Sequence, residues 1–201
     1  RTSSSAASDV YKRQSQANTL AAATSGIVTA TISDGDLATL AGLTETGNAY
    51  SITISDNSVD AAALNTLDGK TTVAIDATAI TTLTGAAADL NTAYDSSGIS
   101  NLGDEAITLS DTSLTAAVLN TLDGNTSGTI DATAVTTLTG AAADLNTAYD
   151  SAGISNLGDE AITLTDTSLT AAVLNTLDGN TSGTIDATAI TTLTGAAADL
   201  N

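Results

Sequence analysis

The chain of 201 residues contains no cysteine, histidine, proline, methionine, tryptophan or phenylalanine. Without cysteine it forms no disulfide, no thiolate metal site and no thiol nucleophile. Without histidine it lacks the usual general base and the commonest ligand of transition metals. It also lacks the G-x-S-x-G and phosphate-loop patterns, and its lone central lysine, Lys70, is replaced by Asn125 in the next repeat. The sequence therefore predicts a protein that is not an enzyme.

Basic residues are nearly absent after the first fourteen positions. Arg1, Lys12 and Arg13 lie at the N-terminus, and only Lys70 follows, against 22 of the 23 acidic residues. The body of the chain thus carries a formal charge of about −21, which repels nucleic acid and anionic membrane surfaces. No apolar run is long enough to span a bilayer. We therefore expect neither a nucleic-acid partner nor membrane insertion.

A long internal repeat organises the chain. Residues 91–145 and 146–200 differ only at Ser97/Ala152, Ser110/Thr165 and Val135/Ile190. A fixed period on this scale, about 55 residues, is typical of solenoids, in which each unit buries its apolar face against its neighbours. The partners that the sequence predicts are therefore the neighbouring repeats of the same chain. Because the last copy stops within the repeat, we also expect the chain to be a piece of a longer protein.

The first fourteen residues, RTSSSAASDVYKRQ, do not share the composition of the repeats. Residues 4–14 resemble a translated sequencing-adapter sequence of the kind that contaminates environmental reading frames. This resemblance implies that residues 1–14 are an artefact, and the alternative is a disordered natural terminus. We expect this segment to be dispensable and residues 15–201 to form a single repeat solenoid.

Each repeat contains two segments in which a strand precedes a helix. In the first, Ile107 and Leu109 alternate with Thr108 and Ser110, which is the two-residue period of a half-buried strand. A helical stripe follows at i, i+3, i+4 and i+8, formed by Leu114, Ala117, Val118 and Leu122. We expect Thr112 or Ser113 to cap this helix and Gly124 to end it in a left-handed conformation.

The second segment begins near Ile130 and leads into a helix over residues 140–149. We expect Thr139 to cap that helix and Gly153 to end it. The isoleucines that anchor the expected strands recur at Ile32, Ile52, Ile75, Ile107, Ile130, Ile162 and Ile185. Their spacing divides each repeat into a longer coil, from Ile75 to Ile107, and a shorter one, from Ile107 to Ile130. The pattern predicts a right-handed parallel α/β solenoid of about seven coils similar to leucine-rich repeats. The alternative is a pure parallel β-solenoid, which the high threonine content favours.

Three short motifs carry a family resemblance: ALNTLDG at 63–69, TTLTG at 81–85 and GLTETGNAY at 42–50. These segments resemble tandem repeats of giant secreted or cell-surface proteins of marine bacteria. The resemblance implies an extracellular, adhesin-like role and supplies no catalytic residues. The leading hypothesis is a non-catalytic spacer or stalk, because tandem copies add length. The alternative is an adhesin surface that binds glycan, calcium or ice.

The ligand-binding hypothesis rests on outward strand positions. The coil division places them in one row, with threonines between the aspartates, in the order Thr53, Asp76, Thr108, Asp131, Thr163 and Asp186. Coils about 4.8 Å apart would then separate successive aspartates by about 10 Å. This row is a candidate surface for calcium or glycan, with Asp76, Asp131 and Asp186 as the metal ligands. The alternative is an ordinary polar strand face.

Two other groups of acids have structural interpretations as well. Asp123 and Asn125, and likewise Asp178 and Asn180, flank a glycine as in calcium loops, but a helix-ending turn fits them better. Asp34, Asp56, Asp111 and Asp166 each follow a strand, and we expect them to cap the helix that comes next. The adjacent acids Asp104-Glu105 and Asp159-Glu160 predict solvated loop charge. Calcium is the one cofactor considered, and we expect no other.

Overall fold

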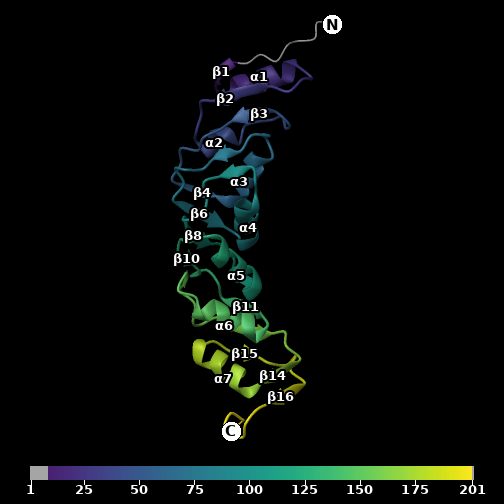
Figure 1. Ribbon diagram of the computed structural model, residues 1–201, viewed down its shortest axis with the longest axis vertical. Coiled ribbons are helices and arrows are strands. Elements are labelled where there is room, and N and C mark those ends of the chain that lie inside the picture. Colours follow the sequence, from purple (N-terminus) through teal and green to yellow (C-terminus); the bar gives the residue numbers. More distant parts are fainter. Residues whose placement is uncertain (1–8, 201) are drawn as a thin grey trace. The chain divides into compact units, whose positions relative to one another are not determined.

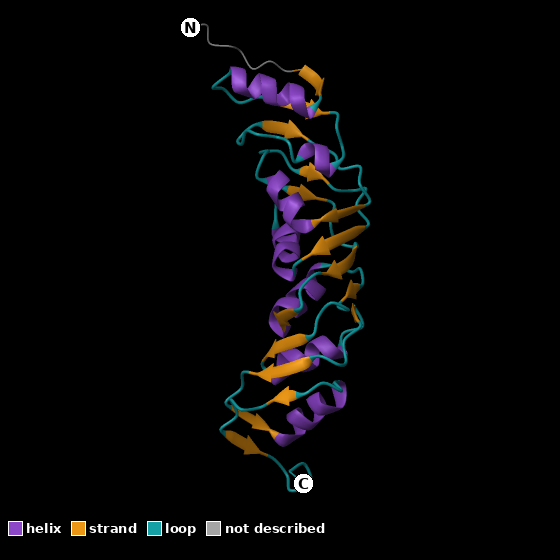
Figure 2. Cartoon of the chain, turned by 180° about the vertical axis from the view of Figure 1, so that it is seen from behind, coloured by secondary structure: helices purple, strands orange, loops and turns teal. Residues whose placement is uncertain are grey.

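The structure is a computed structural model that describes residues 9–200, in which strands and helices alternate along the chain (Figures 1 and 2). It divides into a first unit, residues 9–84 and 89–105, and a second unit, residues 85–88 and 106–200. The elements up to residue 100 are β1 (Asp9–Lys12), α1 (Gln14–Ala23), β2 (Thr29–Ile32), α2 (Leu37–Leu40), β3 (Ala49–Ser51), β4 (Ser58–Asp60), α3 (Ala61–Asp68), β5 (Ile75–Asp76), β6 (Thr82–Gly85), α4 (Ala87–Asp95) and β7 (Ile99–Ser100). The remaining elements are β8 (Ala106–Leu109), β9 (Ser113–Thr115), α5 (Ala116–Asn125), β10 (Ile130–Asp131), β11 (Thr137–Gly140), α6 (Ala142–Asp150), β12 (Ile154–Ser155), β13 (Ala161–Leu164), β14 (Ser168–Thr170), α7 (Ala171–Asn180), β15 (Ile185–Asp186) and β16 (Thr192–Thr194).

All of the strand pairs are parallel. In the first unit β1, β2 and β3 form one sheet, β4 pairs with β6, and β5 pairs with β7. In the second unit the sheets have the strand orders β8-β10-β12, β9-β11-β13-β15 and β14-β16. Helix α5 packs against α6, and α6 packs against α7. The fold is an α/β parallel solenoid-like fold, as predicted, and the helices exclude the alternative of a pure β-solenoid.

The predicted division into longer and shorter coils is wrong. Ile130 does not pair with Ile162 but lies between Ile107 and Ile154. Ile162 in turn lies between Leu138 and Ile185. Successive paired positions are therefore almost evenly spaced along the chain of the second unit. The wider gap between anchors in the sequence arises because the number of strands between consecutive helices varies. Two strands, β10 and β11, lie between α5 and α6, whereas three strands, β12, β13 and β14, lie between α6 and α7.

The strand faces agree with the sequence pattern. Ile107 and Leu109 are buried, whereas Thr108 and Ser110 are exposed. The other predicted anchors are buried too, except for Ile185, which is only half-buried. The two-residue alternation thus identifies which face of β8 contacts the core.

The helix boundaries differ from the prediction. The segment 113–115 continues as strand β9, and α5 begins only at Ala116 with Thr115 as its N-cap. The buried stripe is Ala116, Leu119 and Leu122 rather than the set that begins at Leu114. Gly124 lies inside α5, and it is not among the residues with positive φ. The predicted start was placed too early because Leu114 fits a helical stripe and a strand equally well.

The second helix of the repeat also starts later than expected. Thr139 belongs to β11, and α6 begins at Ala142 after Ala141, whose side chain cannot cap. The C-cap is Ser151, two residues before Gly153. The acceptor that α6 requires at its start comes from another coil, through the carboxylate of Asp166.

Residues 9–14 have regular structure, which differs from the expected disorder. Strand β1 pairs with β2, and the amide of Ser33 donates to the carbonyl of Lys12 over 2.8 Å. Gln14 begins helix α1, and its amide donates to the carboxylate of Asp34 over 2.7 Å. Residues 1–8 lie outside the described residues, and the adapter origin stays a prediction.

Candidate functional site

The aspartates that end the two-residue strands β5, β10 and β15 are the first candidates. In β10 the Oδ1 atom of Asp131 accepts from the amide of Thr133 over 3.0 Å and from its hydroxyl over 2.6 Å. The side-chain amide of Asn156 donates to the same oxygen over 2.8 Å. Because these donors favour the charged form, with the Thr133 hydroxyl foremost and Asn156 next, they hold the pKa of Asp131 below its ordinary value.

The equivalent aspartates of the other repeats form the same turn. Asp76 accepts from the amide and hydroxyl of Thr78 over 3.1 and 2.6 Å and from Asn101 over 2.9 Å. Asp186 accepts from the amide of Thr188 over 2.9 Å. The pKa of Asp76 is lowered chiefly by the Thr78 hydroxyl, and that of Asp186 chiefly by the Thr188 amide. A lowered pKa stabilises the fold above the ordinary aspartate pKa, and this contribution is lost as the pH falls through the lowered one.

These aspartates do not form the predicted row. Asp131 lies between Thr108 and Ser155 in the sheet of β8, β10 and β12. Asp186 pairs with Thr163 in a different sheet of the second unit. In the first unit Asp76 lies beside Thr53 and Ser100. Each aspartate therefore has hydroxyl residues as its strand neighbours, and the spacing of about 10 Å that the coil division implied does not exist between Asp131 and Asp186.

The Asp-Gly-Asn segments connect coils. Asp123, in the last part of α5, accepts from the hydroxyl of Ser151 over 2.8 Å. Gly153 approaches Asp123 so closely that a Cβ there would lie 2.2 Å from its Oδ1. Asn180 donates to the side-chain oxygen of Asn146 over 3.0 Å, and Asp178 is exposed. Asn125 is the last residue of α5. Across residues 9–200, no three acidic side chains are arranged to hold a metal ion.

A second set of aspartates caps helices, but not the helices that were expected. The amides that begin α1, α2, α4 and α6 each donate to an aspartate 19 to 24 residues further along the chain, over 2.7 Å in every case; the pairs are Gln14–Asp34, Leu37–Asp56, Ala87–Asp111 and Ala142–Asp166. Each aspartate thus accepts a hydrogen bond from the first amide of a helix that precedes it in the sequence, instead of capping the helix that follows. This contact accounts for the missing local cap of α6 and ties one coil to the next.

Replacing Asp166 with Ala is expected to lower the free energy of unfolding by about 1 kcal/mol, since the first amide of α6 loses its acceptor. Urea denaturation followed by circular dichroism measures this change. Asp178→Ala is the matched control, because it removes the same charge from an exposed position. Equal losses in the two variants would contradict the cap.

Glu105 and Glu160 are not solvated loop charges, because each is only 1% exposed. The Oε2 atom of Glu160 accepts from the Tyr149 hydroxyl and from the Gly158 amide, both over 2.9 Å. Its Oε1 atom is buried and has no hydrogen-bond partner among residues 9–200. Glu105 accepts in the same way from Tyr94 over 3.0 Å and from Gly103 over 2.9 Å. The single tyrosine per repeat, eleven residues earlier, was the signal for this burial.

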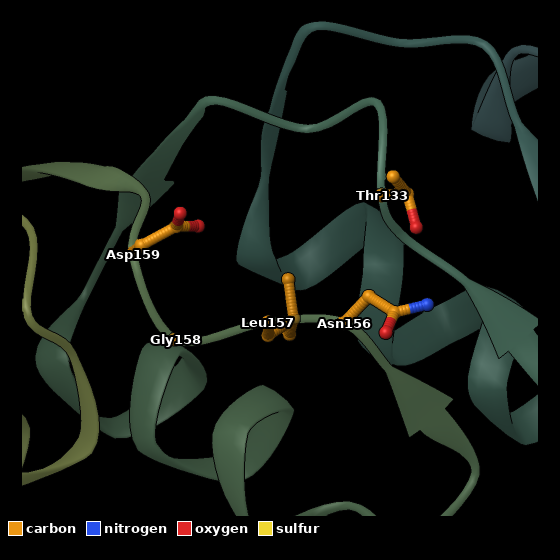
Figure 3. A pocket seen from close by; sticks show the side chains of 5 residues that line it. All are labelled: Thr133, Asn156, Leu157, Gly158 and Asp159. Atoms are coloured by element: carbon orange, nitrogen blue, oxygen red, sulfur yellow. The ribbon is translucent and has the colours of Figure 1, made fainter.

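The loop before Glu160 borders an open surface cavity of about 350 Å³ in the second unit (Figure 3). It is lined by Thr133, Asn156, Leu157, Gly158 and Asp159. Asn156 and Gly158 have φ angles of 63° and 143°, which turn the chain around the cavity. The lining combines a hydroxyl, an amide, a carboxylate and an aliphatic side chain. Such a set can bind a small polar ligand, but these five residues include no activated nucleophile and no pair of side chains for general acid/base catalysis.

Comparison with protein-family models, with curated proteins and with solved structures finds no match for this chain. Among the described residues, every helix is too short or too polar to cross a bilayer.

Proposed function

We propose that this chain is a non-catalytic spacer or stalk region of a large extracellular or cell-surface protein. The observation that carries the proposal is that polar side chains form hydrogen bonds between neighbouring coils. The carboxylates of Asp111 and Asp166, and the amide of Asn156, each bond to a coil other than their own. Side chains that join coil to coil build length, and near-identical tandem copies repeat them at every period.

Asparagines support this role in the same way. The amide of Asn65 donates to the carbonyl of Asp89 over 2.8 Å, and Asn120 donates to the carbonyl of Asp144 over 2.9 Å. The counterpart of Asn120 in the next repeat, Asn175, donates to the carbonyl of Asp199 over 3.0 Å. Each bond joins a helix to the next coil along the chain. The large acidic excess fits a surface that stays soluble and repels its neighbours.

The second candidate is an adhesive surface that binds a ligand in each repeat. The cavity beside Asn156 favours it, because its polar lining recurs in the sequence at residues 101–104. The two functions are compatible, since a stalk can carry weak sites along its length.

The spacer function predicts a fixed increment of length per repeat. Inserting one more copy of residues 91–145 after Leu145 is expected to add about 10 Å to the maximum dimension, because two coils stack at about 4.8 Å each. Small-angle X-ray scattering measures this dimension. A glycine- and serine-rich insert of equal length is the control, and it should add no helix signal in circular dichroism. A longer chain with an unchanged maximum dimension would contradict the proposal.

A further inference from the structure

We propose that the cavity formed by Thr133, Asn156, Leu157, Gly158 and Asp159 is a subsite for one ring of a neutral polysaccharide. The cavity lies within the second unit, and its residues come from the turn after β10 and the loop after β12. This inference deepens the ligand-binding alternative and does not depend on the spacer function.

The hydrogen bonds of the lining residues determine what they can offer a ligand. The Thr133 hydroxyl donates its proton to Asp131, so that it can act toward a ligand only as an acceptor. Asn156 gives one amide proton to Asp131, which leaves its second proton and its carbonyl oxygen. The Gly158 amide already donates to Glu160. The cavity is therefore rich in acceptors and has one side-chain donor, an arrangement that suits the hydroxyl groups of a sugar.

The shape of the lining fits a ring with both polar and apolar parts. In Figure 3 the side chain of Leu157 stands between Asp159 on one side and Thr133 and Asn156 on the other. A sugar ring can lay its C–H groups on the leucine while its hydroxyl groups reach the polar side chains. The volume of about 350 Å³ lies at the small end of the range for ligand pockets, as expected for one ring.

The electrostatics disfavour a divalent cation and an anionic polysaccharide. Asp159 is the only carboxylate among the lining residues, and the Oδ1 atom of nearby Asp131 already accepts three hydrogen bonds. A divalent cation needs more oxygen ligands with charge, and the described chain arranges no three acids for it. An acidic polysaccharide would be repelled by the net charge of −19.

The same hydrogen bonds and loop conformation recur in the first unit. Asp76 there binds Thr78 and Asn101 as Asp131 binds Thr133 and Asn156. Asn101 and Gly103 have φ angles of 67° and 153°, and Leu102 and Asp104 complete the set. Two weak sites in one chain favour a polymer over a free sugar, because linked sites gain affinity through avidity.

A titration followed by ¹H–¹⁵N NMR tests this inference. The probes are the methyl glycosides of glucose, mannose and galactose, added separately to the full chain. We expect at least one of them to shift the amide signals of Gly158 and Gly103 with a dissociation constant in the millimolar range. In Asp159→Ala the shift at Gly158 should be lost while the shift at Gly103 persists, so the first unit serves as an internal control.

Asp178→Ala, which changes an exposed aspartate away from the cavity, should retain both shifts. The inference is overturned if none of the three glycosides shifts Gly158, or if the Gly158 shift survives in Asp159→Ala. A shift with calcium chloride but not with any glycoside would likewise overturn it and indicate a cation site. None of these outcomes bears on the length increment that tests the spacer function.

Discussion

Replacing Ile130 with Asp should destabilise the second unit by about 3–5 kcal/mol, because it buries a carboxylate that has no partner. Ile130 is fully buried, and in the parallel sheet it lies between Ile107 and Ile154. A charge introduced there contacts apolar side chains of both neighbouring coils. Thermal and urea denaturation followed by circular dichroism should show a much lower midpoint, or a chain whose second unit is unfolded.

The control for this change is Ser110→Asp, which adds the same charge at an exposed position. Ser110 directly follows β8, the strand that pairs with β10. It should shift the free energy of unfolding by no more than about 0.5 kcal/mol. If Ile130→Asp melts like the Ser110 variant, Ile130 is not in the core and β10 pairs with its neighbours in a different register.

Local alternation was enough to predict which strand face is buried, but not how the strands stack. The segment from Ile107 to Ser110 is long enough to show a period of two residues, so its inward side chains were identified correctly. Strand β12 consists of Ile154 and Ser155 alone, and no period can be seen in it. Without β12 the next visible anchor after Ile130 was Ile162, and this gave a longer coil that does not exist.

The candidate site could be predicted only as far as its local residues reach. The hydrogen bond from Thr133 to Asp131 spans two residues and follows the common aspartate turn. The bond from Asn156 to Asp131 and the cap from Asp166 to Ala142 each reach from one coil to the next. Such contacts depend on the coil length, so they cannot be predicted when that length is wrong. The correct coil length would have placed Asp166 beside the start of α6.

Replacing Tyr149 with Phe should also have a large effect, lowering the free energy of unfolding by about 2–3 kcal/mol, because hydrogen bonds to charged groups are worth about 1.5–3 kcal/mol. The tyrosine hydroxyl donates to the carboxylate of Glu160, which is only 1% exposed. Without it the carboxylate keeps only the Gly158 amide on Oε2, while Oε1 already has no partner among residues 9–200. Urea denaturation followed by circular dichroism measures the loss.

Alkaline pH gives a second measurement of the same residue. Burial raises the pKa of Tyr149, and the neighbouring Glu160 carboxylate raises it further, whereas the Thr181 side chain acts in the opposite direction. A raised pKa keeps the tyrosine neutral in the folded chain, so its contribution to stability is complete below about pH 10, the ordinary tyrosine pKa, and falls above it. Tyr149→Phe should therefore lose less stability than the parent chain between neutral and strongly alkaline pH.

A double-mutant cycle with Glu160→Gln separates the effect of the buried charge from that of the hydrogen bond itself. Glutamine keeps an acceptor for the tyrosine but removes the buried charge, so in that background Tyr149→Phe should cost only about 1 kcal/mol, as for a neutral hydrogen bond. The coupling energy between the two positions is then about 1–2 kcal/mol, within the range for residues in contact. If Tyr149→Phe costs the same in both backgrounds, the charge of Glu160 does not strengthen its hydrogen bond with the tyrosine, and if it costs nothing in either, the hydroxyl does not contribute to stability.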